Sequence, residues 1–178
     1  PPETTGISPY TGAMAEGLRR EGHEVRAVVA HPHYPQWKVT PGYGQWSRKE
    51  LLQGVSTHRA RHYVPRKPSG IRRLLSELSF GVRLMFAPFN APDAVVTISP
   101  ALFSSAAAAL RMRMFHRGTP LVVWVQDLYW LGLRETGQDG GLSSRVIRAT
   151  EKWLLSNADR VVVIHDRFAD RVSADFNI

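Results

Sequence analysis

The sequence predicts an α/β fold in which a mostly parallel sheet carries helices on both of its faces. Strand patterns and helix patterns alternate along nearly the whole chain, as they do in proteins built from β-α-β units. The ranges Asp93–Ser99 and Pro120–Val125 are short apolar runs, typical of strands buried on both faces. Polar residues follow the second run directly, where open α/β sheets place their chemistry.

The N-terminal stretch predicts a turn that leads into a helix. Ser8 and Pro9 fit the N-cap and the first helical position, and Gly22 fits the end of the helix. His23–Ala30 then has the pattern of a strand. Loop, helix and strand make half of a β-α-β unit, so we expect the first strand upstream of Pro1. Without that strand, the sheet should show a gap or a substitute strand.

The remaining elements follow in order, within one expected domain that spans residues 1–178. Neither an internal repeat nor a low-complexity linker interrupts the chain, and its end resembles a cut within a longer protein. The expected hairpin arms are residues 49–52 and 54–60. Helices are expected at residues 71–86, 101–115, 145–155 and from 166 onward, and a last strand at residues 159–164.

Composition narrows the class of protein. The chain has 178 residues, 43% of them apolar, and no apolar run is long enough to cross a bilayer. It has no cysteine, which excludes disulfides and cysteine-ligated metals and fits a cytoplasmic protein. The formal charge of +8 suggests phosphorylated ligands, anionic lipid or nucleic acid, or simply a solvated basic surface. Nucleic acid is the least favoured because the chain has no recognition motif.

Two segments stand out for their side chains. The loop from His31 to Trp46 is rich in proline, histidine and aromatic residues, so its rings either line a binding cleft or pack the loop down. No metal site is expected, because His31 and His33 have no third ligand at suitable spacing. The region Arg66–Arg83 is cationic, which indicates either the solvated face of an amphipathic helix or contact with anionic lipid or a pyrophosphate.

A series of motifs, spread along the chain in one order, resembles glycosyltransferase family 4. Among its branches, the colanic acid fucosyltransferases and N-acetylfucosamine transferases are the most similar. The motifs are Glu3-Thr4-Thr5-Gly6-Ile7, Tyr10-Thr11-Gly12, Gly22-His23-Glu24-Val25, Pro32-His33-Tyr34-Pro35-Gln36-Trp37, Tyr63-Val64-Pro65-Arg66-Lys67-Pro68-Ser69, Val125-Gln126-Asp127-Leu128 and Ala158-Asp159-Arg160-Val161-Val162-Val163-Ile164.

The resemblance implies a GT-B architecture, in which two Rossmann-like domains face each other across a cleft. This chain resembles the N-terminal, acceptor-side domain, and the C-terminal domain that holds most of the donor is absent from it. The implied reaction is retaining sugar transfer from a nucleoside-diphosphate sugar, without a metal or other cofactor. Catalysis then needs groups from both domains, so we expect the isolated domain to be nearly inactive.

The resemblance also assigns a donor site. Gly6 matches the glycine that approaches the donor diphosphate, with Thr5 and Ile7 beside it. Physical reasoning agrees, because a glycine amide at a helix N-terminus stabilises negative charge on a leaving diphosphate. A plain turn glycine is the alternative interpretation. Ser8-Pro9 stand where family members often carry glycine and arginine, and Pro9 has no N–H to donate.

Catalysis and acceptor binding are assigned to other motifs. Gln126-Asp127 match a His-Asp pair of the family, so Asp127 is expected to orient or polarise the acceptor hydroxyl, while Gln126 holds a sugar hydroxyl. Capping of the following turn is the alternative for Asp127. Glu135 is the first carboxylate after it in sequence. The acceptor side is expected to comprise Tyr10, His33, Tyr34, Trp37 and Arg66.

The implied partners are the nucleotide-sugar donor, the chain's own C-terminal domain and a saccharide acceptor, expected to be polyprenyl-linked, used in cell-surface polysaccharide synthesis. The expected location is the cytoplasm, with peripheral contact at the inner face of an anionic membrane and no nucleic acid. A different class remains open: a non-catalytic Rossmann-like module that uses the same loop to bind a phosphorylated ligand.

Overall fold

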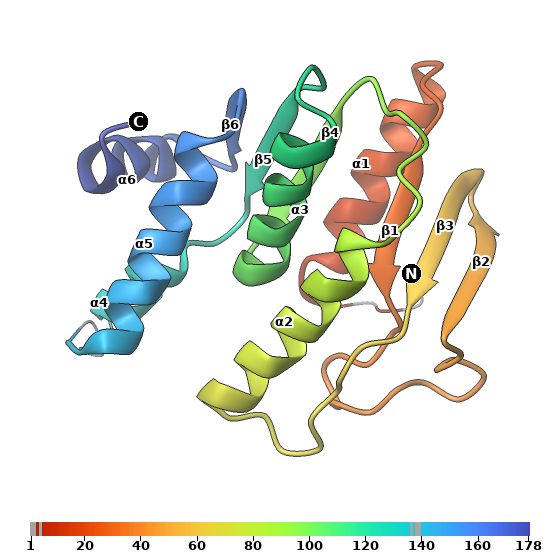
Figure 1. Cartoon of the computed structure of the whole chain (residues 1–178), viewed down its shortest axis with the longest axis horizontal. Helices are drawn as coiled ribbons and strands as arrows, with labels where there is room; N and C mark the ends of the chain where they lie inside the picture. Colours follow the sequence, from red (N-terminus) through yellow and green to blue (C-terminus); the bar gives the residue numbers. More distant parts are fainter. Residues whose placement is uncertain (1–2, 4, 136, 138–139) are drawn as a thin grey trace. The chain divides into compact units, whose positions relative to one another are not determined.

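The computed structural model describes residues 3, 5–135, 137 and 140–178. Thr4 of the Glu3–Ile7 motif, and Pro1 and Pro2 before that motif, lie outside the described residues. The chain divides into two compact units, residues 1–87 and residues 88–178, and each unit is described by itself. Figure 1 shows the helices and strands along the chain. The expectation of a single domain stays a prediction.

The first unit is built on a three-stranded sheet. Its strands are β1 (Arg26–Ala30), β2 (Ser47–Leu52) and β3 (Val55–Ala60), in the order β1-β3-β2 (Figure 1). β1 runs parallel to β3, with Ala30 opposite Ala60, and β2 runs antiparallel to β3. The predicted hairpin is therefore confirmed. Helix α1 (Ser8–Arg20) precedes the sheet, and helix α2 (Gly70–Met85) follows it.

A two-residue turn fixes the register of this hairpin. Gln53 and Gly54 both have positive φ angles, 50° and 82°. That combination matches the right-handed twist of the two flanking strands, which is why tight hairpins favour it. Glycine adopts such an angle at no steric cost, so Gly54 is the residue that makes this short connection possible.

The second unit is a parallel α/β layer. Strands β4 (Val95–Ser99), β5 (Leu121–Val125) and β6 (Arg160–Val163) pair in sequence order, all parallel. The connecting helices are α3 (Leu102–Phe115), α4 (Tyr129–Glu135) and α5 (Leu142–Ser156), and α6 (Asp166–Phe176) follows β6. This arrangement confirms the predicted α/β, Rossmann-like class. Helix α4 is an element that the sequence patterns do not predict.

The strands form two sheets rather than one. Among the described strands, no hydrogen-bonded ladder joins β1-β3-β2 to β4-β5-β6. The expected gap or substitute strand stays a prediction, because each sheet belongs to one unit and each unit is described by itself. The strand upstream of Pro1 itself stays a prediction.

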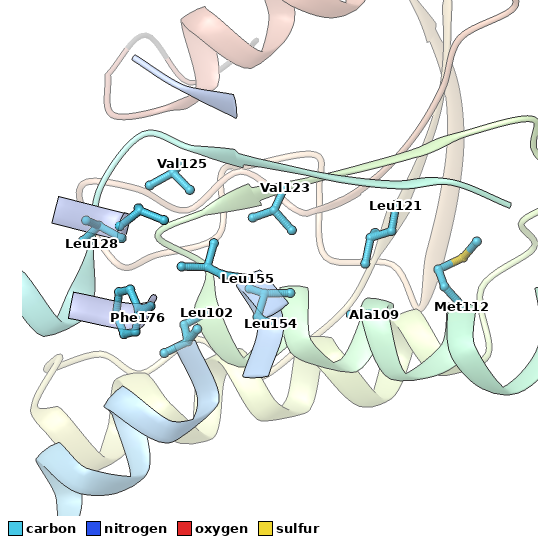
Figure 2. Close-up of a cluster of buried hydrophobic side chains, with 11 residues drawn as sticks. Leu102, Ala109, Met112, Leu121, Val123, Val125, Leu128, Leu154, Leu155 and Phe176 are labelled. Atoms are coloured by element: carbon cyan, nitrogen blue, oxygen red, sulfur yellow. The ribbon is translucent and has the colours of Figure 1, made fainter. Parts of the chain in front are cut away.

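One apolar cluster forms the core of the second unit (Figure 2). Alternate residues of β5 point into it, because successive side chains of a strand face opposite sides of the sheet. Helices α3, α5 and α6 supply the rest, together with Leu128. The cluster consists of Leu102, Ala109, Met112, Leu121, Val123, Val125, Leu128, Leu154, Leu155, Val172 and Phe176.

Three local predictions are wrong. Ser8 is not the N-cap of α1: Ile7 occupies that place with nearly helical angles, and no side chain caps the helix. The strand predicted from His23 begins only at Arg26, since residues 21 and 22 form the turn that ends α1. β4 is not buried on both faces, because Val96 is 38% exposed.

Helix α2 occupies the predicted range, but its apolar residues do not form a core face. Its buried positions are Ser76, Gly81 and Leu84. Most of the apolar residues whose spacing predicted the helix lie in solvent. Those exposed are Leu75, Leu78, Val82 and Phe86, together with Ile71.

Two leucines of α5 provide a test of the core. Leu154 is 1% exposed and Leu142 is 79% exposed, so Leu154→Ala opens a cavity and Leu142→Ala does not. We expect Leu154→Ala to lower the free energy of unfolding by about 2–5 kcal/mol. The effect of Leu142→Ala should stay within about 0.5 kcal/mol. Chemical denaturation followed by circular dichroism measures both, and equal losses would contradict the assigned core.

Candidate functional site

The N-terminal turn presents a glycine at the start of α1. Gly6 is exposed and has a φ of +67°, a left-handed angle that other residues adopt only at a cost. Ile7 follows as the N-cap, and its carbonyl accepts hydrogen bonds from the Thr11 N–H at 3.0 Å and the Thr11 hydroxyl at 2.8 Å. The N–H groups of the first helical turn have no partner within the helix, which makes this end suited to an anion.

A single carboxylate oxygen ties this turn to the loop after β1. Glu3 Oε1 accepts the backbone N–H of His33 at 2.7 Å and that of Tyr34 at 2.8 Å. Both are charge-assisted hydrogen bonds, which are stronger than bonds between neutral groups. Two segments about thirty residues apart in sequence are thereby held together.

Gly6 lies directly beside the ring of Tyr34. A Cβ atom added at Gly6 would stand 3.4 Å from Tyr34 Cε1 and 3.6 Å from Cδ1. The Tyr34 side chain is 45% exposed, so it stands at the surface next to the glycine. The structure thus brings together one predicted donor residue and one predicted acceptor residue.

Behind Tyr34 the other rings of the loop pack against one another. His33 lies 5.0 Å from His62 and 5.7 Å from Trp37, measured between ring centroids, and Trp37 lies 6.5 Å from Tyr34. His62 continues the stack to Phe80 of α2 at 5.6 Å. Packing within the loop therefore accounts for His33 and Trp37, whereas Tyr34 keeps an exposed ring.

His62 serves this stack as a neutral ring. Burial first, and then the nearby His33 and His31, lower the pKa of His62 to about 3. Its Nδ1 is shielded from solvent and has no hydrogen-bond partner among the described residues. An imidazole without charge packs like an apolar ring, which fits its place between His33 and Phe80.

The remaining predicted residues of the first unit stand apart. Thr5 is exposed in the turn, Tyr10 is 66% exposed on α1, and Arg66 is exposed before α2. Within the described part of the chain, no hydrogen bond or ring contact joins Tyr10 or Arg66 to the aromatic stack. Instead Arg73 of α2 reaches it, with its guanidinium carbon 5.3 Å from the Trp37 ring centre. Sequence patterns did not single out Arg73 for this place.

In the second unit, the predicted Gln126-Asp127 pair sits at the carboxyl end of β5. The buried Ser99 at the end of β4 donates its hydroxyl to the Asp127 carbonyl, which links the two strand ends. Asp127 itself is exposed, and its Oδ1 accepts the Leu128 N–H at 2.8 Å. Gln126 is half-buried, and its Nε2 is shielded without a partner among the described residues. One Asp127 oxygen thus caps the following turn, which is the alternative interpretation of this residue.

Glu151 is the residue that sequence reasoning missed. From α5 its two oxygens accept the N–H groups of Tyr129 at 2.9 Å and Trp130 at 3.0 Å, so it caps the start of α4 just after Asp127. Only 2% of its surface is exposed. Burial raises the pKa of Glu151 to about 7, the two backbone N–H groups oppose this shift, and the charges of Asp127 and Asp175 add to it. The sequence does contain a signal for a buried carboxylate, because Glu151 lies on the same helix face as the apolar residues Ile147 and Leu154.

The described residues form neither a metal site nor a helix that crosses a membrane. Among them, no three His, Asp or Glu side chains gather in an arrangement that holds a metal ion. No described helix combines the length and the apolar character needed to cross a bilayer.

The raised pKa of Glu151 gives a pH dependence. The folded protein keeps a proton that the unfolded chain releases near pH 4.5. This contribution to stability is complete below that pH and is lost as the pH rises through about 7, with a slope of up to about 1.4 kcal/mol per pH unit. Glu151→Gln removes the titration, so the variant should show a flatter profile of unfolding free energy between pH 5 and pH 8, the span over which denaturation is followed.

In Glu151→Gln an NH₂ group replaces one of the two carboxylate oxygens. One of the backbone N–H groups of Tyr129 and Trp130 then faces a donor instead of an acceptor. At the acidic end of the range we therefore expect a loss of about 1–3 kcal/mol, which shrinks as the pH rises. Glu135→Gln, at an exposed carboxylate of α4, is the matched control and should keep the wild-type profile. Parallel profiles for wild type and Glu151→Gln would contradict the assignment.

Comparison with known proteins identifies relatives along the length of the chain. Residues 5–178 match the family described as glycosyl transferase 4-like domain. Over 173 residues the chain is 38% identical to the "Putative colanic acid biosynthesis glycosyl transferase WcaI" of Escherichia coli (strain K12), covering 92% of this chain and 42% of that protein. The chain thus spans less than half of that relative. No solved structure matches it. The chain belongs to the glycosyl transferase 4-like domain family.

Proposed function

We propose that this chain is the acceptor-side part of a retaining glycosyltransferase that transfers a sugar from a nucleoside-diphosphate sugar to a saccharide in cell-surface polysaccharide synthesis. Family membership supports the reaction class, and the name of the Escherichia coli relative supports the setting. The observation that carries the proposal is Gly6, an exposed left-handed glycine at the start of α1, clamped beside Tyr34 by Glu3.

Gly6 would serve the donor, with Thr5 and Ile7 on either side. Because glycine has no side chain, a diphosphate can approach the backbone closely at the N-terminus of α1. Positive charge from the helix dipole then stabilises the negative charge that develops on the leaving diphosphate. We propose that the reaction needs no metal or other cofactor, since these backbone groups supply the stabilisation.

Asp127 and Gln126 would serve the acceptor. One Asp127 oxygen is held by the Leu128 N–H, which leaves Oδ2 to accept a hydrogen bond from a sugar hydroxyl. Glu151 acts through the backbone, because it fixes the residues that follow Asp127. The exposed ring of Tyr34 offers a flat apolar face for a sugar ring. Tyr10, His33, Trp37 and Arg66 complete the proposed acceptor side.

The setting is proposed on the same grounds. We place the enzyme in the cytoplasm, at the inner face of the membrane, with a polyprenyl-linked saccharide as acceptor and a C-terminal domain as the partner that holds the donor. The name of the relative does not mention a sugar, so the resemblance to fucosyltransferases stays a prediction.

The role of Asp127 can be tested in the longer protein that contains this chain. Asp127→Asn keeps the Oδ1 acceptor for Leu128 but loses the negative charge. We expect kcat to fall by about 10²- to 10⁴-fold, the usual contribution of a positioned acid or base, while the Kd for the nucleotide-sugar stays within about twofold. Asp170→Asn, at an exposed residue of α6, is the control and should leave kcat unchanged. Full activity of Asp127→Asn would overturn this role.

Gly6 has a matched control within the same segment. In Gly6→Ala the new methyl group stands 3.4 Å from Tyr34 Cε1, and the alanine must adopt the left-handed backbone angle of Gly6. The turn should therefore shift away from the donor. We expect kcat/KM for the nucleotide-sugar to fall by about tenfold, equivalent to about 1–2 kcal/mol of backbone strain. Gly17→Ala lies within α1 with nothing within 4 Å, and it should preserve kcat/KM while stabilising the helix.

The Asp127→Asn and Gly6→Ala experiments also distinguish a glycosyltransferase from the alternative class, a non-catalytic binding module. A non-catalytic binding module would bind a nucleotide-sugar or another phosphorylated ligand, weaken on Gly6→Ala, and show no transfer before or after Asp127→Asn. Product analysis by NMR of the anomeric carbon then tests retention, and an assay with EDTA tests the absence of a metal requirement.

A further inference from the structure

Helix α2 carries a continuous apolar stripe on its solvent side. The stripe, called the α2 stripe below, contains one residue about every turn, at spacings of three or four. At 100° per residue, its members fall within a sector of about 80°. They are Ile71 (70% exposed), Leu75 (50%), Leu78 (43%), Val82 (58%) and Phe86 (83%) at the C-cap.

The opposite side of α2 is the one that packs within the first unit. Ser76 donates its hydroxyl to the Tyr63 carbonyl at 2.7 Å, and Leu84 is buried. Beside the stripe, the Tyr63 N–H donates to the Ser79 hydroxyl at 2.9 Å, and on the opposite side Phe80 stacks on His62. These contacts fix the rotation of α2 and hold the α2 stripe outward. Single exposed apolar residues are ordinary, but a row of five along one helix face marks an interaction surface.

Charge identifies what this surface fits. Between Arg66 and Phe86 the chain has five cationic residues and one acidic residue. Arg66, Lys67 and Arg72 are exposed near the start of α2, where Ile71 begins the stripe. An apolar helix face bordered by cations is the pattern of a helix that lies in the interface of an anionic membrane. A second copy of the chain would bring the same cations against one another, so charge disfavours self-association.

We propose that the α2 stripe inserts into the surface of an anionic lipid bilayer, with Arg66, Lys67 and Arg72 against the lipid headgroups. The helix lies in the plane of the interface and does not cross it. Such insertion adds an apolar contact surface to the peripheral location proposed above. It concerns lipid contact alone and needs neither donor nor acceptor, so its failure would leave the transfer reaction standing.

The absence of cysteine from the chain allows a direct test. Val82→Cys introduces a unique thiol in the α2 stripe, and Leu51→Cys introduces one on β2, where Leu51 is 72% exposed. Each variant is labelled with an environment-sensitive fluorophore and mixed with phosphatidylcholine vesicles that contain phosphatidylglycerol. We expect a blue shift at Val82→Cys, quenching there by brominated acyl chains, and neither effect at Leu51→Cys.

Partition into the same vesicles is then measured by co-sedimentation. Leu75→Gln/Val82→Gln keeps good helix formers at exposed positions, so folding should survive while binding falls by more than tenfold. Lys67→Gln and Arg72→Gln should each lower binding by about fivefold, which corresponds to about 1 kcal/mol per basic residue. Leu51→Gln is the apolar control and should bind as the wild type does. Vesicles of phosphatidylcholine alone should bind much more weakly.

Four results would overturn the proposal. The first is equal fluorescence shifts at Val82→Cys and Leu51→Cys. The second is undiminished vesicle binding by Leu75→Gln/Val82→Gln. The third is a response to inorganic pyrophosphate without a response to vesicles, which would assign the cations to an anion site instead. The fourth is a stable dimer whose formation hides the Val82→Cys label, which would make a second copy of the chain, and not the membrane, the partner of the α2 stripe.

Discussion

The buried guanidinium of Arg59 joins the three strands of the first unit close to the loop that carries Tyr34. Arg59 is 5% exposed in β3, pairs with Glu50 of β2 and donates Nη1–H to the carbonyl of Ala30, the last residue of β1, at 2.9 Å. It also lies 5.1 Å from the Tyr43 ring centre. One side chain therefore joins three strands to the loop that leaves β1. Removing one partner of such a buried pair is costly because the remaining charge stays without compensation.

The loop from His31 to Trp46, called the aromatic loop below, is held at both of its ends. His31 is buried, and its Nε2 lies 2.8 Å from the Gln45 carbonyl, while Glu3 binds the next two N–H groups of the loop. Long loops ordinarily show conformational variety, and sites need the reverse. The polar contacts beneath this loop therefore explain how Tyr34 keeps a defined position next to Gly6 while its ring remains exposed.

Much of the fold could be predicted from the sequence, because the apolar run of β5, the run of small residues in α3 and the helical periodicity of α5 are strong local signals. The hairpin followed from the alternating pattern of residues 54–60 and the short segment 49–52 directly before it. Helix α4 could not be predicted, because its first N–H groups are satisfied by Glu151, more than twenty residues away in sequence. Likewise, periodicity shows that α2 has an apolar face but not whether protein covers it. Among the site residues, Gly6 and Tyr34 meet through Glu3, a contact that no local pattern encodes.

Helix α2 has a second edge, and two of its arginines hold tryptophans there. The guanidinium carbon of Arg73 lies 5.3 Å from the Trp37 ring centre, and that of Arg83 lies 3.9 Å from the Trp46 ring centre. Arg83 also donates to the Trp46 carbonyl at 2.9 Å. The helix that shows an apolar face to its surroundings thus grips the aromatic loop at two points. If this loop and α2 move together, a constraint that holds the helix in one position changes the affinity of a ligand that prefers one position of the loop, and the ligand acts on the helix by the same factor. The contacts of Arg73 and Arg83 thus give the surroundings of α2 a physical route to the loop that carries Tyr34.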